Sequence, residues 1–170
     1  MNNFKVIIVE DVPLELKGTE GIIRNDIPEA EVIGTANNEA EYWRIIRDNQ
    51  PDLVLLDLGL GGSTTVGVEI CRHTKESYPA VKVLIFTGEI LNEKLWVDVL
   101  DAGADGIILK SGELLTRGDV RSVMEGKTMV FNEPILRRIV ERFKLSVNRE
   151  LTNQEALLDY EIDEYDERFL

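Results

Sequence analysis

The chain has 170 residues, of which 44% are hydrophobic and 30% are charged, so it is long enough for one globular domain with residues to spare. Its formal net charge of -13 at pH 7 argues against direct binding to the phosphate backbone of nucleic acids. A single cysteine excludes an internal disulfide, and no apolar run approaches the roughly 20 residues that span a bilayer. We therefore expect a cytoplasmic protein with no membrane contact.

Five short apolar runs, separated by segments with helical character, predict an α/β fold. Their nearly continuous apolar character is typical of parallel strands that helices cover on both faces. The strands are expected near residues 5–9, 31–35, 53–57, 81–87 and 106–109. The second is the least apolar, so we place it at an edge of the sheet. The pattern indicates a doubly wound, parallel, five-stranded sheet.

Each gap between the strands carries ordinary helix signals. Pro13 suits the first turn of a helix, and Asn37 or Asn38 can cap the next helix, which stops before Pro51. The last three helices are expected near residues 67–77, 92–102 and 114–125.

The pattern changes after Gly126. Residues 132–134, Asn-Glu-Pro, are typical of a helix start, and apolar residues follow at helical spacing at Ile135, Ile139, Val140 and Phe143. Because five strands and five helices complete a domain, we expect this extra C-terminal helix to act as a linker or dimer contact. We therefore divide the chain into a domain at 1–128, a linker helix at 129–148 and an acidic tail at 149–170.

Polar side chains follow four of the expected strands at the point where each strand ends. Glu10 and Asp11 follow the first strand, Asp57 the third, Thr87 the fourth and Lys110 the fifth. The carboxyl ends of parallel strands meet at one edge of a sheet, so we expect these five side chains to lie close together.

Three neighbouring carboxylates need compensating positive charge. Two like charges 4 Å apart repel by about 4 kcal/mol at an effective dielectric constant of about 20. Lys110 supplies one positive charge, and a divalent cation would supply the rest. Oxygen ligands without histidine or cysteine indicate Mg²⁺, with Mn²⁺ as a substitute.

Asp57 follows the most apolar strand and has a central position, so we expect it to be a nucleophile. Carboxylates attack phosphoryl groups to form aspartyl-phosphates, a reaction that depends mainly on positioning and charge neutralisation. We expect Lys110 to contact one phosphoryl oxygen and Thr87 to donate a hydrogen bond to another.

Four short motifs resemble those of the response-regulator receiver domain. They are Val9-Glu10-Asp11, Leu55-Leu56-Asp57, Phe86-Thr87-Gly88 and Ile108-Leu109-Lys110. Residues 102–111, and residues 124–127 leading into 134–136, most resemble the LuxR/NarL-type subfamily. The resemblance covers about residues 4–145.

The resemblance implies a flavodoxin-like (βα)5 domain that a sensor histidine kinase phosphorylates on Asp57. It implies that Asp11 and Asp57 ligate Mg²⁺ directly, that Glu10 assists through water, and that the carbonyl of Gly59 is the backbone ligand. It further implies regulation of transcription in a full-length protein, with DNA bound only through a downstream output domain that this chain lacks. A homodimer would form through the first and fifth helices or the face next to Ile107.

Three positions depart from the family pattern. Segment 58–67 lacks the usual proline and is about two residues longer, and its glycines favour mobility, so we expect an altered Mg²⁺ affinity or phosphorylation rate. Ile107 stands where the family commonly has the Tyr or Phe that moves together with Thr87, so we expect a changed switch. Ser111 follows Lys110 in place of proline.

Residues 151–155, Leu-Thr-Asn-Gln-Glu, resemble the start of the helix-turn-helix domain of LuxR/NarL-type regulators. The residues that follow are strongly acidic. Either the chain is a truncated part of a longer DNA-binding regulator, or this resemblance is accidental.

Two other classes of function remain open. A phosphorylation-independent interaction module is favoured by Ile107 and segment 58–67 and opposed by the intact acids and lysine. A phosphatase of the haloacid-dehalogenase type also uses an aspartate nucleophile, but it needs a second acid two residues later, where Gly59 stands. We expect no enzymatic activity beyond the chain's own phosphorylation and dephosphorylation.

Overall fold

The computed structural model describes residues 3–88, 92–110 and 114–127, together with 130–131, 133, 135–137, 139–141 and 144–145. The chain divides into two compact units, Met1–Asn132 and Glu133–Leu170. The first unit contains all the strands and helices named below.

The first unit is built on one parallel sheet with the strand order β2-β1-β3-β4-β5-β6. The strands are β1 (Phe4–Val9), β2 (Ala30–Ala36), β3 (Leu53–Leu56), β4 (Lys82–Thr87), β5 (Gly106–Leu109) and β6 (Val130–Phe131). The α/β fold and the edge position of β2 are as predicted. The five predicted strands are all present in one parallel sheet, and the structure adds a sixth at its edge, β6, which is too short to show any periodicity in the sequence.

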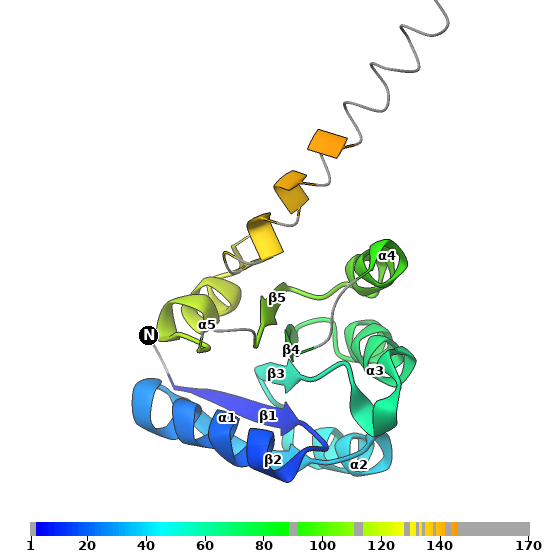
Figure 1. The fold of residues 1–170 in the computed structure, drawn as a ribbon. Helices are drawn as coiled ribbons and strands as arrows, with labels where there is room; N and C mark the ends of the chain where they lie inside the picture. Colours follow the sequence, from blue (N-terminus) through cyan, green and yellow to red (C-terminus); the bar gives the residue numbers. More distant parts are fainter. Residues whose placement is uncertain are drawn as a thin grey trace, which may run out of the picture. The chain divides into compact units, whose positions relative to one another are not determined.

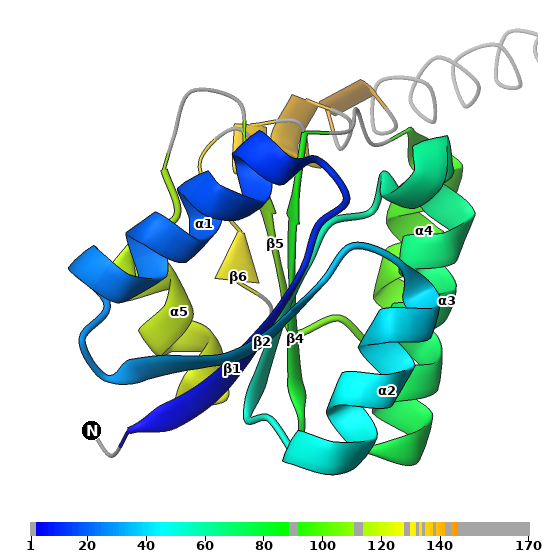
Figure 2. The same cartoon turned by 90° about the horizontal axis from the view of Figure 1, so that it is seen from below.

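Helices cover both faces of the sheet, as expected for apolar parallel strands. They are α1 (Pro13–Asp26), α2 (Glu39–Asn49), α3 (Thr64–Ser77), α4 (Glu93–Asp101) and α5 (Arg117–Met124), with a short 3-10 turn η1 (Leu60–Gly62) before α3. Helices α1 and α5 lie on one face, and α2, α3 and α4 lie on the other (Figures 1 and 2).

Alternate residues of each central strand point to opposite faces and fill two apolar layers. The layer beneath α1 and α5 contains Val6, Ile8, Ile23, Leu53, Leu55, Leu84, Ile108, Val120 and Val123. Each of these side chains is at most 2% exposed, and burying one contributes about 1.5–3 kcal/mol relative to leaving it in water. This burial holds the strand ends in place where the polar side chains emerge.

Two helix starts differ from the predictions. Helix α3 begins at Thr64 rather than near Gly67, so the last part of segment 58–67 is helical. Helix α5 begins at Arg117 because Thr116 and Asp119 form a capping box, each side chain bonding to the other's backbone N–H. The prediction had placed this start near Leu114.

The second unit is described only in part. Its described residues, 133, 135–137, 139–141 and 144–145, are helical, in the region of the predicted linker helix. The predicted tail at 149–170 lies outside the described residues, and the division at 128 and 148 stays a prediction. Within the described part of the chain, no helix is both long and apolar enough to cross a bilayer.

Candidate functional site

Strand register brings the predicted site residues to one edge of the sheet. Val9 pairs with Leu56 between β1 and β3, and the backbone N–H of Asp57 donates a hydrogen bond of 2.9 Å to the Val9 carbonyl. On the other side, the N–H of Lys110 donates a bond of 2.9 Å to the Thr87 carbonyl. The ladder therefore continues one residue beyond these strands and fixes the backbone from which the polar side chains project.

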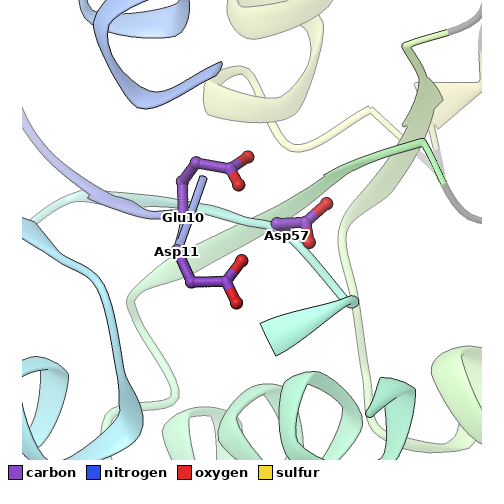
Figure 3. Close-up of side chains that lie close together, drawn as sticks. All are labelled: Glu10, Asp11 and Asp57. Carbon is purple, nitrogen blue, oxygen red and sulfur yellow. The ribbon is translucent and has the colours of Figure 1, made fainter. Parts of the chain in front are cut away.

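Three carboxylates converge at this edge. One oxygen from each of Glu10, Asp11 and Asp57 lies within 4.8 Å of the others. Figure 3 shows the three side chains extending in the same direction from the ends of β1 and β3. Glu10 and Asp57 are buried, and Asp11 is half-buried. The structure brings the three acids together as the sequence predicted, and their roles as metal ligands remain predictions.

Two glycine N–H groups orient the aspartates. Gly59 donates a 2.7 Å bond to Oδ2 of Asp57, and Gly61 donates a 2.7 Å bond to Oδ2 of Asp11. Gly61 has φ of 61°, a left-handed conformation that favours glycine. Segment 58–67 is thus hydrogen-bonded to Asp11, which follows β1. These two bonds, rather than the predicted mobility of the segment, determine how the aspartates are oriented.

Gly67 lets α3 approach the backbone that follows β3. A Cβ atom at this position would lie 2.6 Å from the Cα of Leu58, 2.9 Å from its carbonyl oxygen and 3.0 Å from that of Asp57. Only glycine permits this contact without a shift of the backbone. The carbonyl of Gly59 accepts a bond of 3.1 Å from the N–H of Gly62, and its predicted role as a metal ligand is a proposal.

Lys110 joins the carboxylates of Glu10, Glu15 and Asp57 into one ionic network. Its Nζ lies 3.2 Å from Oδ1 of Asp57 and 2.6 Å from Oε2 of Glu15, and it also contacts Glu10. The ammonium lies 5.4 Å from the centre of the Phe86 ring, a favourable cation–π distance. Burial lowers the pKa of Lys110, but bonds to Glu10 and Glu15 and the charge of Asp57 outweigh it, so the pKa lies above its usual value.

Glu15 is a site residue that the sequence analysis missed. It lies in the first turn of α1, where an acidic residue is ordinarily explained by the helix dipole. Its contact with Lys110 joins residues 95 positions apart. Its place in the first turn of the helix that directly follows Glu10 and Asp11 is the signal that the sequence offers.

Glu10 has a pKa above its ordinary value. Burial is the largest cause, and the nearby charge of Asp57 adds to it, whereas bonds from Lys110 and from the N–H of Val12 act in the opposite direction. The cluster therefore holds more negative charge than Lys110 compensates in the absence of a cation.

We predict that this excess charge shapes the pH dependence of stability. Because the folded pKa of Glu10 exceeds the unfolded value, the folded state binds more protons between them, and the free energy of unfolding falls as pH rises through that window. Glu10→Gln should remove this fall, and so should Mg²⁺. Urea unfolding from pH 4 to 8 checks it, and identical pH profiles for wild type and Glu10→Gln without Mg²⁺ would contradict it.

Comparisons with known proteins agree with this geometry. Residues 6–116 match the family described as "Response regulator receiver domain". The chain belongs to this family. Residues 130–170 match a family of unknown function (DUF5932).

The receiver domain has curated relatives among transcriptional regulators. It is 31% identical over 130 residues to the DNA-binding transcriptional activator DevR/DosR of Mycobacterium tuberculosis, covering 75% of this chain and 58% of that protein. It is 30% identical over 141 residues to the response regulator VraR of Staphylococcus aureus, covering 82% and 65%. The chain thus spans about three fifths of the length of such relatives.

Solved structures share the fold. A LuxR-family response regulator from Aurantimonas sp. SI85-9A1 has a TM-score of 0.72 at 27% identity, covering 83% of this chain and 98% of that one. The receiver domain of RcsB from Salmonella enterica has a TM-score of 0.68 at 22% identity, covering 80% and 98%, and shows likeness of fold alone. The predicted LuxR/NarL-type receiver domain is confirmed.

In this receiver domain the predicted switch residues lie on adjacent strands. Thr87 at the end of β4 and Ile107 on β5 are both fully buried. Ile107 stands in register with Ile85 on β4 and with Phe131 on β6. The ring of Phe131 packs edge-on against Trp96 of α4, with 6.0 Å between ring centres. The sequence analysis missed the Trp96–Phe131 pair. Ser111, the third position that departs from the family pattern, lies outside the described residues.

Proposed function

We propose that this receiver domain accepts a phosphoryl group on Asp57 from the phosphohistidine of a sensor histidine kinase, with Mg²⁺ bound, in the cytoplasm. Phosphorylation would control an output, which is transcription in a full-length protein that reaches DNA through a further domain. The observation that carries the proposal is the contact of Lys110 with Asp57 beside two further acids.

The residues present fit a hard divalent cation. One oxygen from each of Glu10, Asp11 and Asp57 lies within 4.8 Å of the others. Together the three carboxylates carry more negative charge than Lys110 neutralises. Such an all-oxygen set suits Mg²⁺, and the carbonyl of Gly59 would add a backbone ligand. When bound, Mg²⁺ would neutralise charge on the phosphoryl oxygens and on the acceptor.

The chain's own groups would position and stabilise the transferred group. A carboxylate oxygen of Asp57 forms the new O–P bond while the P–N bond to the kinase histidine breaks and its electron pair stays on the ring nitrogen. The N–H of Gly59 holds the carboxylate in position. Lys110 and the hydroxyl of Thr87 would contact the phosphoryl oxygens, in the roles that the sequence suggests.

The names of the relatives support the wider proposal. DevR/DosR is named a DNA-binding transcriptional activator, and RcsB, which is similar in fold, is described as dimers bound to DNA. We extend to this chain both regulation of transcription and formation of a homodimer. Because the chain is strongly negative and would repel the DNA backbone, we assign DNA binding to a separate output domain.

Beryllofluoride, which mimics a bound phosphoryl group, tests the proposal. Saturable binding should require Mg²⁺, disappear in Asp57→Ala and persist in Asp101→Asn, a control that removes an exposed acid from the last position of α4. Absence of binding at millimolar Mg²⁺ would support a phosphorylation-independent module. Turnover of phosphoester substrates would instead support the phosphatase.

We further propose that Thr87 and Ile107 transmit phosphorylation to α4 through the Trp96–Phe131 pair. The row Ile85-Ile107-Phe131 crosses three strands, and its last member contacts α4. Aromatic packing beside the isoleucine would thereby take the place of an aromatic at position 107. This is a shift of packed elements of the kind that switching proteins use.

Trp96 emission checks this readout. In a Trp43→Phe background, which leaves Trp96 as the reporter, beryllofluoride with Mg²⁺ should change the emission of Trp96. Phe131→Ala should weaken the change without preventing beryllofluoride binding. If calorimetry shows binding while Trp96 emission stays constant, the proposed route is wrong.

A further inference from the structure

Glu15 contacts Lys110 from the solvent side of the acceptor site. Its side chain is 47% exposed, whereas those of Glu10 and Asp57 are 4% and 10% exposed. Its Oε2 lies 2.6 Å from Nζ of Lys110. Glu15 is also outside the group of three acids whose oxygens could share a cation. It is therefore bound to the lysine and not to the predicted metal site.

Within the described part of the chain, the N–H donors of the Lys110 ammonium are all engaged. A lysine ammonium has three N–H donors. Among the described residues, three carboxylates accept from it, namely Glu10, Glu15 and Asp57. A phosphoryl oxygen that takes a hydrogen bond from Lys110 must therefore replace one of these three acceptors.

The carboxylate that gives way is the one that water can solvate most readily. Glu10 is buried and also accepts from the N–H of Val12, and Asp57 is buried and also accepts from the N–H of Gly59. Releasing either from Lys110 would leave a buried charge with less compensation. Glu15 can turn into solvent from the first turn of α1, and a half-exposed ion pair is weak.

We propose that Glu15 is a positioning residue that occupies Lys110 before phosphorylation and competes with the incoming phosphoryl group for it. This rests on the proposed function of Asp57. Glu15 would set how readily the anion binds and how fast Asp57 is phosphorylated. Its release would also detach α1 from the end of β5, so that arrival of the phosphoryl group changes a contact of α1.

Neutralising Glu15 should make the site bind phosphoryl mimics more tightly. Glu15→Gln keeps an oxygen that can accept from Lys110 but removes the competing charge. With Mg²⁺ present, beryllofluoride affinity and the rate of phosphorylation by acetyl phosphate should each rise about two- to fivefold, as expected for a half-exposed ion pair. The rise should shrink at high salt, and the affinity for Mg²⁺ alone should change little.

The chain offers a matched control. Glu20→Gln removes the same charge from α1, where Glu20 pairs with Arg24 at 2.8 Å and has no contact with Lys110. Glu20→Gln should behave like wild type. In a Lys110→Ala background, Glu15→Gln should lose its effect, because the two residues act through the same contact.

The outcomes separate this inference from the function on which it rests. If wild type binds beryllofluoride with Mg²⁺ but Glu15→Gln matches Glu20→Gln, the inference is wrong and the acceptor function stands. Weaker binding by Glu15→Gln would also overturn it, because Glu15 would then support Lys110 rather than compete for it. If wild type fails to bind beryllofluoride, both are wrong.

Discussion

Replacing Lys110 with alanine should lower the free energy of unfolding by about 3–5 kcal/mol in the absence of divalent cations, because it leaves buried carboxylates without their counter-ion. Lys110 is only 15% exposed, and it contacts Glu10, Glu15 and Asp57. Mg²⁺ should recover part of this loss, since a bound cation would replace the missing charge. Metal binding should be retained, whereas the response to phosphoryl mimics should be lost.

Urea unfolding with and without Mg²⁺ measures this effect. Lys17→Ala is the matched control, because Lys17 is an exposed lysine on α1. An equal loss of stability in the two variants, or a loss that Mg²⁺ leaves untouched, would argue against Lys110 as the counter-ion of the cluster. If beryllofluoride still changed the emission of Trp96 in Lys110→Ala, this would argue against a role of Lys110 in the response.

Gly67→Ala should destabilise the domain and weaken the acceptor site together. Its Cβ would lie 2.6 Å from the Cα of Leu58, and this contact is with backbone that cannot rotate away. Forcing α3 outwards should cost about 1–3 kcal/mol. Because the Asp57 carbonyl is among the displaced atoms, beryllofluoride affinity should fall as well.

Gly18→Ala gives the opposite expectation and serves as the control. Apart from the neighbouring backbone of α1 itself, a Cβ at Gly18 would have no heavy atom within 4 Å, and alanine is favoured over glycine in helices by about 1 kcal/mol. This variant should gain stability and bind beryllofluoride like wild type. If Gly67→Ala proved as stable as Gly18→Ala, the close approach of α3 to β3 would not be a constraint on the site.

The sheet and the positions of the site acids were predictable because both depend on local patterns. Continuous apolar runs identify β1, β3, β4 and β5, and parallel strands place whatever follows them at one edge. Asp57 and Lys110 meet for this reason, although 53 residues separate them. Residues that follow parallel strands can thus be predicted from the sequence to lie close together.

The features that were missed depend on tertiary structure or on short segments. Strand β6 has two residues, too few for a periodic signal. The start of α3 was obscured by the glycines and β-branched residues of segment 60–67, and Gly67 is needed there for packing rather than as part of a loop. The contact between Glu15 and Lys110 joins the first turn of α1 to the residue after β5, which no local sequence pattern indicates.

The proposed function separates capture of a phosphoryl group from its readout. Capture would depend on the neighbouring acids Glu10, Asp11 and Asp57 and on Lys110, which contacts Glu10 and Asp57. Readout would depend on packing around the buried Ile107, which is in register with Phe131, whose ring packs against Trp96 of α4. Substitutions in the packed row should therefore change the response while leaving capture intact.

Covalent phosphorylation of Asp57 is the central claim, and peptide mapping tests it directly. The full chain is incubated with acetyl phosphate and Mg²⁺, and the acyl phosphate is trapped by borohydride reduction before digestion. We predict one modified residue, Asp57, that requires Mg²⁺ and is absent from Asp57→Ala. An unmodified chain at millimolar Mg²⁺, or a modification that persists in Asp57→Ala, would contradict the account.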